Sequence, residues 1–114
     1  MNLNKPQNTD KMVWTKHSLE KMRFYNLSEN RLKRVLRNLD RKEEGIAPET
    51  IAIMQRTGSK KHPTEIWLMY QIIKSKVKSQ KLKVISAWRY PGISPPGKEI
   101  PIPQDILEEL NKII

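Results

Sequence analysis

The sequence predicts an α+β fold in which two N-terminal helices pack on a three- to four-stranded antiparallel sheet, with a further helix at the C-terminus. Three observations predict it. Apolar residues recur at helical spacing in the first third of the chain and again at its end. Short segments rich in Ile, Val, Trp and Tyr fill the middle, and a proline-rich stretch separates them from the last helix.

The two N-terminal helices each have a start signal. Thr15 is a suitable N-cap for the first, whose apolar stripe includes Met22 and which Asn26 interrupts. Ser28 is the expected N-cap of the second. The strongest helical periodicity in the chain follows it, at Leu32, Val35, Leu36 and Leu39.

Three strands are expected, at residues 50–56, 65–73 and 81–89. Turn residues lie between the first two, and a short polar segment lies between the last two, so successive hairpins should form an antiparallel meander. In the third strand, alternation predicts one shared face for Leu82, Val84, Ser86 and Trp88.

These elements divide the chain into four parts. Residues 1–11 are expected to be a flexible arm, and residues 12–90 the α+β domain. Residues 91–103 form a connector that holds five of the eight prolines, and residues 104–114 form an amphipathic helix. We expect this helix to pack back onto the domain, because an Ile/Leu face left in water promotes association.

The charge is large and unevenly distributed. The 114 residues include 22 Lys and Arg against 12 Asp and Glu, a net charge of +10. Residues 56–89 hold nine basic residues and a single acidic one, whereas residues 90–114 are net acidic. A concentrated positive field predicts a polyanionic partner: nucleic acid, an acidic protein or an anionic surface.

Composition excludes several classes of function. The absence of cysteine excludes Cys-ligated zinc, iron–sulfur clusters and thiol nucleophiles, and is typical of a cytoplasmic protein. No apolar run approaches the roughly 20 residues of a membrane span, so no membrane partner is expected. Two histidines without zinc-ligand spacing indicate neither a metal site nor a cofactor.

Basic and aromatic side chains suggest how RNA could be bound. Lysines at a spacing of two should line one side of a hairpin and follow a phosphate backbone, or else keep a sheet edge polar against strand addition. These lysines are Lys74, Lys76, Lys78, Lys81 and Lys83. Lys16 and Arg23 lie close to His17 in sequence and are further phosphate-binding candidates. Trp88 and Tyr90 are candidates for base stacking, with core packing as the alternative.

His17 is a candidate general acid or base. Cleavage of RNA by its own 2′-hydroxyl needs a base, an acid and cations against the pentavalent phosphorane, but no metal. The alternative is that His17 orients the first helix or packs against Trp14.

An ordered series of short motifs resembles a known family. It comprises W-T-K-H at 14–17, then Leu19, Lys21 and Met22, then L-S at 27–28, V-L at 35–36 and K-V-I-S-A-W-R at 83–89. Together, over residues 13–90, they resemble the small BrnT-like and related proteins of the RelE-type toxin superfamily. The resemblance implies a metal-independent endoribonuclease that cuts RNA, often messenger RNA, which could be ribosome-bound, and that is restrained by a cognate antitoxin.

The resemblance also implies roles for particular residues. His17 matches the early histidine of the pattern and Arg89 the late basic residue, which would stabilise the phosphorane. Arg56 and Lys83 are secondary candidates for holding phosphate. The chain departs from the pattern after Tyr90, where it offers no His, Tyr or Arg. Two alternatives therefore stand beside the ribonuclease: a non-enzymatic nucleic-acid-binding module, and an interaction domain for an acidic protein.

Overall fold

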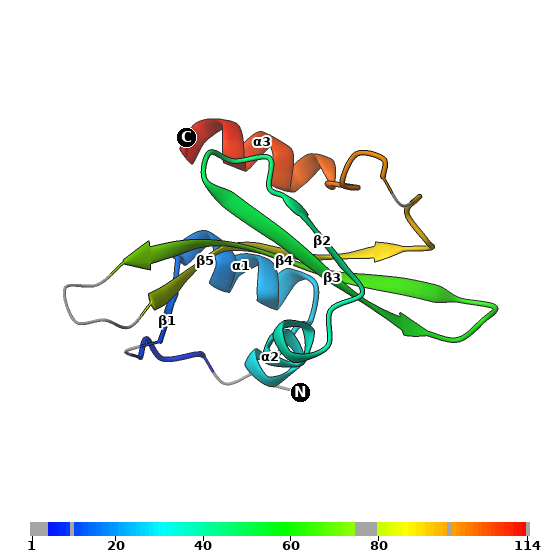
Figure 1. Cartoon of the computed structure of the whole chain (residues 1–114), viewed down its shortest axis with the longest axis horizontal. Helices are drawn as coiled ribbons and strands as arrows, with labels where there is room; N and C mark the ends of the chain where they lie inside the picture. Colours follow the sequence, from blue (N-terminus) through cyan, green and yellow to red (C-terminus); the bar gives the residue numbers. More distant parts are fainter. Residues whose placement is uncertain (1–4, 10, 75–79, 96, 114) are drawn as a thin grey trace.

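The computed structural model describes residues 5–9, 11–74, 80–95 and 97–113. Five strands form one sheet in the order β1-β5-β4-β3-β2 (Figure 1). The strands are β1 (Met12–Trp14), β2 (Arg41–Glu44), β3 (Thr50–Gly58), β4 (Pro63–Lys74) and β5 (Gln80–Pro91). The helices are α1 (Lys16–Phe24), α2 (Glu29–Arg37) and α3 (Gln104–Ile113). None of these helices is long and apolar enough to cross a membrane.

The α+β class is confirmed, but the expected three- to four-stranded antiparallel sheet is wrong. β3, β4 and β5 form the predicted meander, and each outer edge carries one more strand. β1 pairs in parallel with β5, and β2 pairs antiparallel with β3. The sequence does not predict either strand, because β1 has only three residues and β2 reads RKEE. Charged side chains on the β2 edge also disfavour pairing with another chain.

The helix start signals are confirmed, and one periodic position is corrected. Thr15 accepts a hydrogen bond from the backbone N–H of Ser18, and Ser28 accepts one from that of Arg31. After α1 the chain turns at Asn26, which has a left-handed φ of 56° that asparagine tolerates. α2 ends at Arg37, so Leu39 lies beyond it and is exposed.

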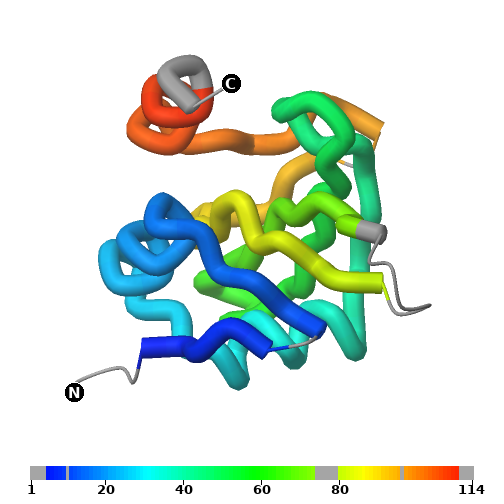
Figure 2. The backbone as a smooth tube through the Cα atoms, turned by 90° about the vertical axis from the view of Figure 1, so that its left-hand side faces the viewer, coloured from blue at the N-terminus to red at the C-terminus, as the bar shows by residue number. Residues whose placement is uncertain are grey.

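Both faces of the sheet are apolar, and each is covered. α1 packs against β5 and α2 against β3 and β4, so the two helices of the predicted layer cover different strands of the sheet. This first core contains Met22, Leu32, Val35, Ile53 and Leu68. The other face carries the second core, in which α3 and the connector cover Trp67 and Trp88. Figures 1 and 2 show α2 and α3 on opposite sides of the sheet.

α3 packs back onto the domain, as its apolar stripe predicts. Ile106 and Leu110 are buried in the second core, together with side chains of all three central strands. Apolar burial of this kind is the main source of stability for a short helix, which is marginal in water by itself.

A β-bulge changes which residues of β5 share a face. Met69 lies opposite Ser86, but Tyr70 lies opposite Val84, so Ile85 has no partner across the pair. The extra residue reverses the alternation beyond it. Val84 consequently belongs to the first core and Trp88 to the second, and the predicted common face of these two residues is wrong.

Buried polar groups fasten the connector to the sheet. Glu65 has no solvent exposure and accepts hydrogen bonds from Ser94, through its backbone N at 2.9 Å and its Oγ at 2.6 Å. Arg41 Nη1 donates to the same Oγ at 2.8 Å. Further along, Trp88 Nε1 donates to the carbonyl oxygen of Pro101 at 2.9 Å. A buried carboxylate is tolerated only with such partners, so these contacts fix the path of the chain toward α3.

Candidate functional site

The start of α1 is fixed against β5, and this positions His17. Thr15 Oγ1, at the N-cap, donates to the carbonyl oxygen of Val84 at 2.8 Å. In the next turn, His17 is only 8% exposed, and its Nε2 lies 2.9 Å from Ser86 Oγ. Its Nδ1 lies 2.7 Å from Glu109 Oε2 on α3. Both ring nitrogens of the predicted acid–base residue are therefore in contact with protein groups.

Lys21 and Tyr25 follow His17 at intervals of one helical turn and contact the same part of α3. Lys21 Nζ lies 2.7 Å from Asp105 Oδ2 and 2.8 Å from Glu109 Oε1. Tyr25 donates its hydroxyl to Asp105 Oδ1 at 3.0 Å. We call His17, Lys21, Tyr25, Asp105 and Glu109 the α1–α3 cluster. Two side chains of α1 and the residue that caps its C-terminal end thus contact two carboxylates of α3.

The contacts between Lys21 and the two carboxylates favour the ionised forms of Lys21, Asp105 and Glu109. Burial lowers the pKa of Lys21, but its bonds to the two carboxylates outweigh burial and raise the pKa overall. Burial raises the pKa of Asp105, but hydrogen bonds from Lys21 and Tyr25 lower it further than that. The hydrogen bond from Lys21 likewise lowers the pKa of Glu109. Burial, with Asp105 next to the hydroxyl, raises the pKa of Tyr25 and keeps it protonated.

Ser86, His17 and Glu109 have the connectivity of a serine hydrolase triad, with Nε2 toward the serine and Nδ1 toward the acid. A nucleophilic serine must also be reachable by a substrate carbonyl. Ser86 is fully buried, so its hydroxyl meets no substrate in this conformation. The three residues instead link β5, α1 and α3.

A second group of polar residues lies on the face covered by α2. Arg31 of α2 donates from Nη1 to Gln55 Oε1 of β3 at 2.7 Å. Across the sheet, Gln55 lies opposite Ile66 and Ile66 lies opposite Arg89. Arg34 is on the same side of α2 as Arg31, three residues further on. We call Arg31, Arg34 and Arg89 the arginine cluster.

The arginine cluster concentrates like charge. Burial lowers the pKa of Arg31, and the nearby charges of Arg34 and Arg89 lower it further. Among the described residues, none of the three guanidinium groups forms an ion pair with a carboxylate. Arg89 instead donates two long hydrogen bonds, of 3.4 Å each, to the carbonyl oxygen of Tyr25 at the end of α1. Like charges held together without a counterion attract an anion.

An exposed aromatic ring precedes Tyr25, the residue whose carbonyl oxygen Arg89 contacts. Phe24, which precedes Tyr25, is 70% exposed, and Arg23 before it is exposed as well. An exposed ring among cations suits stacking with an unpaired base. Neither Phe24 nor the pairing of α2 with Arg89 was predicted from the sequence. The basic pair at i and i+3 was visible there, but its distance from Arg89 depends on long-range packing.

Of the lysines predicted to follow a phosphate backbone, Lys81 and Lys83 do not lie beside the arginine cluster. Lys81 and Lys83 are half-buried in the part of β5 that approaches β1, and Lys83 lies opposite Val13. Six residues of strand, about 20 Å, separate Lys83 from Arg89. Lys74 is the last residue of β4, and Lys76 and Lys78 lie outside the described residues. The structure therefore does not bring Lys81 and Lys83 together with Arg89.

The remaining predicted residues have varied surroundings. Lys16 and Arg56 are exposed, at the start of α1 and in β3. Trp88 has no solvent exposure and stacks on Trp67, with ring centroids 5.9 Å apart and ring planes 9° apart. Tyr90 is half-buried against the second core. Trp88 consequently has no free ring face to offer a base in this structure.

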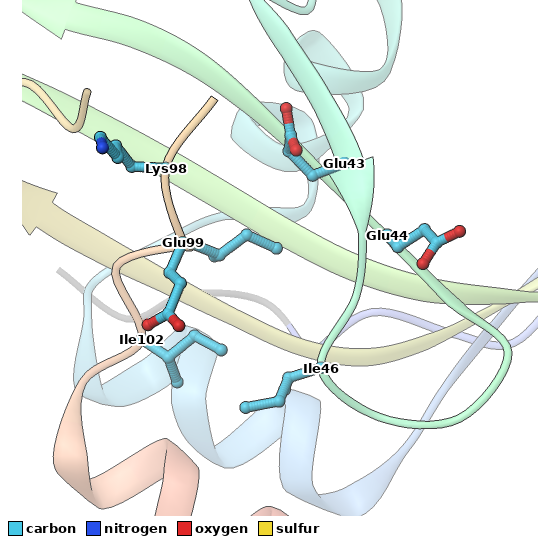
Figure 3. A pocket seen from close by; sticks show the side chains of 7 residues that line it. Glu43, Glu44, Ile46, Lys98, Glu99 and Ile102 are labelled. Carbon is cyan, nitrogen blue, oxygen red and sulfur yellow. The ribbon is translucent and has the colours of Figure 1, made fainter. Parts of the chain in front are cut away.

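A groove of about 510 Å³ lies on the α3 side, between β2 and the connector (Figure 3). Three carboxylates and one ammonium group border it, and its other side chains are isoleucines. The residues that line it are Glu43, Glu44, Ile46, Lys98, Glu99, Ile100 and Ile102. This charge balance disfavours a phosphate ligand. In the described ranges no three His, Cys, Asp or Glu side chains gather as a metal ion would need.

Comparison with other proteins gives no match to a family model, to a curated protein or to a solved structure. The resemblance to RelE-type toxins therefore stays a prediction.

We predict that acid weakens the docking of α3. The pKa values of Asp105 and Glu109 are lowered in the folded protein, so their contribution is present above the unfolded values of about 3.9 and 4.3 and is lost below them. The free energy of unfolding, measured in urea, should fall between about pH 5 and pH 3. In the variant Asp105→Asn/Glu109→Gln, the free energy of unfolding should fall less over this pH range than it does in the wild type.

Glu108→Gln is the matched control, because Glu108 is exposed and its side chain accepts a bond only from Gln104 among the described residues. It should keep the acid dependence of the wild type. An unchanged acid dependence in the double variant would contradict the prediction.

Proposed function

We propose that this protein binds RNA and that the arginine cluster contacts its phosphate backbone. The observation that supports this most is the convergence of Arg31, Arg34 and Arg89, with no carboxylate paired to them in the described chain. A protein gains nothing in stability from bringing like charges together, whereas a phosphate backbone compensates them and releases counterions.

Two further features favour a single-stranded ligand. Phe24 is an exposed aromatic that directly precedes Tyr25, whose carbonyl oxygen Arg89 contacts, and such rings stack on unpaired bases. The β3–β4 hairpin projects beyond α2 (Figure 1), and its tip carries the exposed Lys60 and Lys61. Lys60 and Lys61 thus add positive charge at the tip of this hairpin. The resemblance to RelE-type toxins favours RNA over DNA.

We predict that Arg34→Gln weakens RNA binding. Arg34 is exposed, so its replacement should leave the fold intact. In a fluorescence titration with a labelled single-stranded RNA of ten nucleotides, affinity should fall several-fold at 100 mM salt. The slope of log K against log salt should decrease by about 0.7, the value for one lost contact to a single-stranded phosphate backbone.

Lys98→Gln is the charge-matched control, since Lys98 is exposed on the side of the acidic groove. It should bind RNA nearly as the wild type does. Equal losses in the two variants would show a diffuse charge effect and contradict the proposed surface. Binding of an acidic protein through Arg34, with no binding of RNA, would favour the interaction-domain alternative.

Metal-independent cleavage of RNA is the second candidate, supported by the gathering of His17, Lys21 and Tyr25. In this reaction the 2′-oxygen loses its proton to a base and bonds to the adjacent phosphorus. The bond to the 5′-oxygen breaks, an acid protonates that oxygen, and a 2′,3′-cyclic phosphate and a 5′-hydroxyl remain. His17 is the proposed acid or base. Lys21 shares Glu109 with His17, whereas Arg89 contacts the main chain of Tyr25, so Lys21 is the better placed cation.

A toxin of this kind would act in the cytoplasm on messenger RNA and would be held by an antitoxin. We predict that the protein cuts RNA in the presence of EDTA and leaves 2′,3′-cyclic phosphate ends, and that His17→Ala abolishes this activity. His62→Ala is the control, because His62 is the other histidine and is exposed. Circular dichroism checks the fold of both variants. A wild-type protein that cuts no RNA, ribosome-bound message included, would exclude this candidate.

A further inference from the structure

The α1–α3 cluster pairs a cationic helix face with acidic side chains of the same chain. Each of the four carboxylate oxygens of Asp105 and Glu109 lies within 3.0 Å of a nitrogen of α1 or of the hydroxyl of Tyr25, which caps α1. Lys21 bridges the two carboxylates, and Tyr25 and His17 each contact one of them. Lys21 and Tyr25 hold the carboxylates by charge-assisted hydrogen bonds from different directions, as a protein holds an anion with several oxygens.

The two sides of the cluster differ in exposure. The side chains of His17 and Lys21 are 7% and 8% exposed, whereas those of Asp105 and Glu109 are 37% and 38% exposed. The donors thus form the floor of a site, and the carboxylates lie on its solvent side. An anion that replaced the carboxylates would reach the same donors from solvent.

The docking of α3 does not depend on these charges alone. Ile106 and Leu110 already bury the helix against Trp67 and Trp88. A buried lysine is expensive to desolvate, and apolar residues of similar volume commonly stabilise a protein equally well or better. Lys21 and His17 are better explained by a ligand that needs them than by the packing of α3.

We infer that His17, Lys21 and Tyr25 form a binding site for a phosphodiester of single-stranded RNA, and that the carboxylates of α3 occupy this site in the free protein. The inference rests on the proposed RNA-binding function and adds a second contact region to it. The arginine cluster binds the RNA strand near the C-terminal end of α1. The site formed by His17, Lys21 and Tyr25, which we call the masked site, binds a further phosphate once Asp105 and Glu109 move away. α3 thereby competes with RNA.

The test uses the full chain with both carboxylates neutralised. Asp105→Asn/Glu109→Gln keeps the size of both side chains and leaves Ile106 and Leu110 in place. The probe is a labelled single-stranded RNA of ten nucleotides, and fluorescence anisotropy gives its Kd. The double variant should bind about tenfold more tightly than the wild type, as expected for recovered hydrogen bonds to a charged group. Adding Lys21→Gln should abolish the gain.

The double variant also gains two units of net charge, so it needs a control with the same gain. Glu99→Gln/Glu108→Gln provides it, because both glutamates are exposed and neither belongs to the α1–α3 cluster. This control should tighten binding far less. If the double variant does not fold, Glu109→Gln with Glu108→Gln as its control replaces the pair, and the same outcomes decide.

Two results would overturn the inference: an equal gain in the charge-matched control, or a gain that persists with Lys21→Gln. These failures are distinct from failure of the proposed function. Wild-type binding that depends on Arg34, without a specific gain in the double variant, overturns only the masked site. If no variant binds RNA, the proposed function fails as well.

Discussion

The sheet of this protein is apolar on both faces, and the remaining structure follows from the need to cover both of them. α1 and α2 cover one face, and a connector and α3 cover the other. The connector and α3 form a short segment at the C-terminal end of the sequence. It is therefore fixed by specific polar contacts as well as by apolar burial: Glu65 with Ser94 at the start of the connector, Trp88 with Pro101 near its end, and Lys21 with Asp105 and Glu109 on α3.

This arrangement separates the charges of the molecule. Arg31, Arg34 and Arg89 meet on the α2 side, where no carboxylate of the described residues pairs with them. The acidic C-terminal segment lies on the other side, where its carboxylates either contact α1 or border the groove beside β2. The polyanion-binding surface that we propose is therefore on the α2 side of the protein. The acidic helix that ends the chain contacts cations that such a ligand would also seek.

Much of the fold could be predicted from the sequence, because local signals determine it. The caps at Thr15 and Ser28, the turn at Asn26 and the apolar stripe of α3 are all where local preferences place them. β2 could not be predicted, because its charged residues form a strand only through pairing with β3. The bulge at Ile85 is likewise a property of strand pairing, and it alone decides that Trp88 joins the second core.

The candidate sites were harder to predict, because they depend on contacts between distant segments. The sequence predicts catalytic roles for His17 and Arg89, but it does not predict the partners that surround them in the structure. Asp105 and Glu109 lie more than 80 residues from His17 in the chain, and sequence periodicity places them only on the outer side of a helix. The sequence predicts that lysines at a spacing of two follow a phosphate backbone. In the structure, the cations that lie near one another are instead arginines of α2 and β5.

The central claim is that RNA contacts the arginine cluster, and a map of the contact surface tests it most directly. Uniformly ¹⁵N-labelled protein titrated with a single-stranded RNA of ten nucleotides gives such a map by NMR. The account predicts the largest shift changes at the amides of Arg31, Arg34 and Arg89, with little change at Glu44 and Ile46 beside the acidic groove. Changes concentrated at the groove, or no change at saturating RNA, would contradict it.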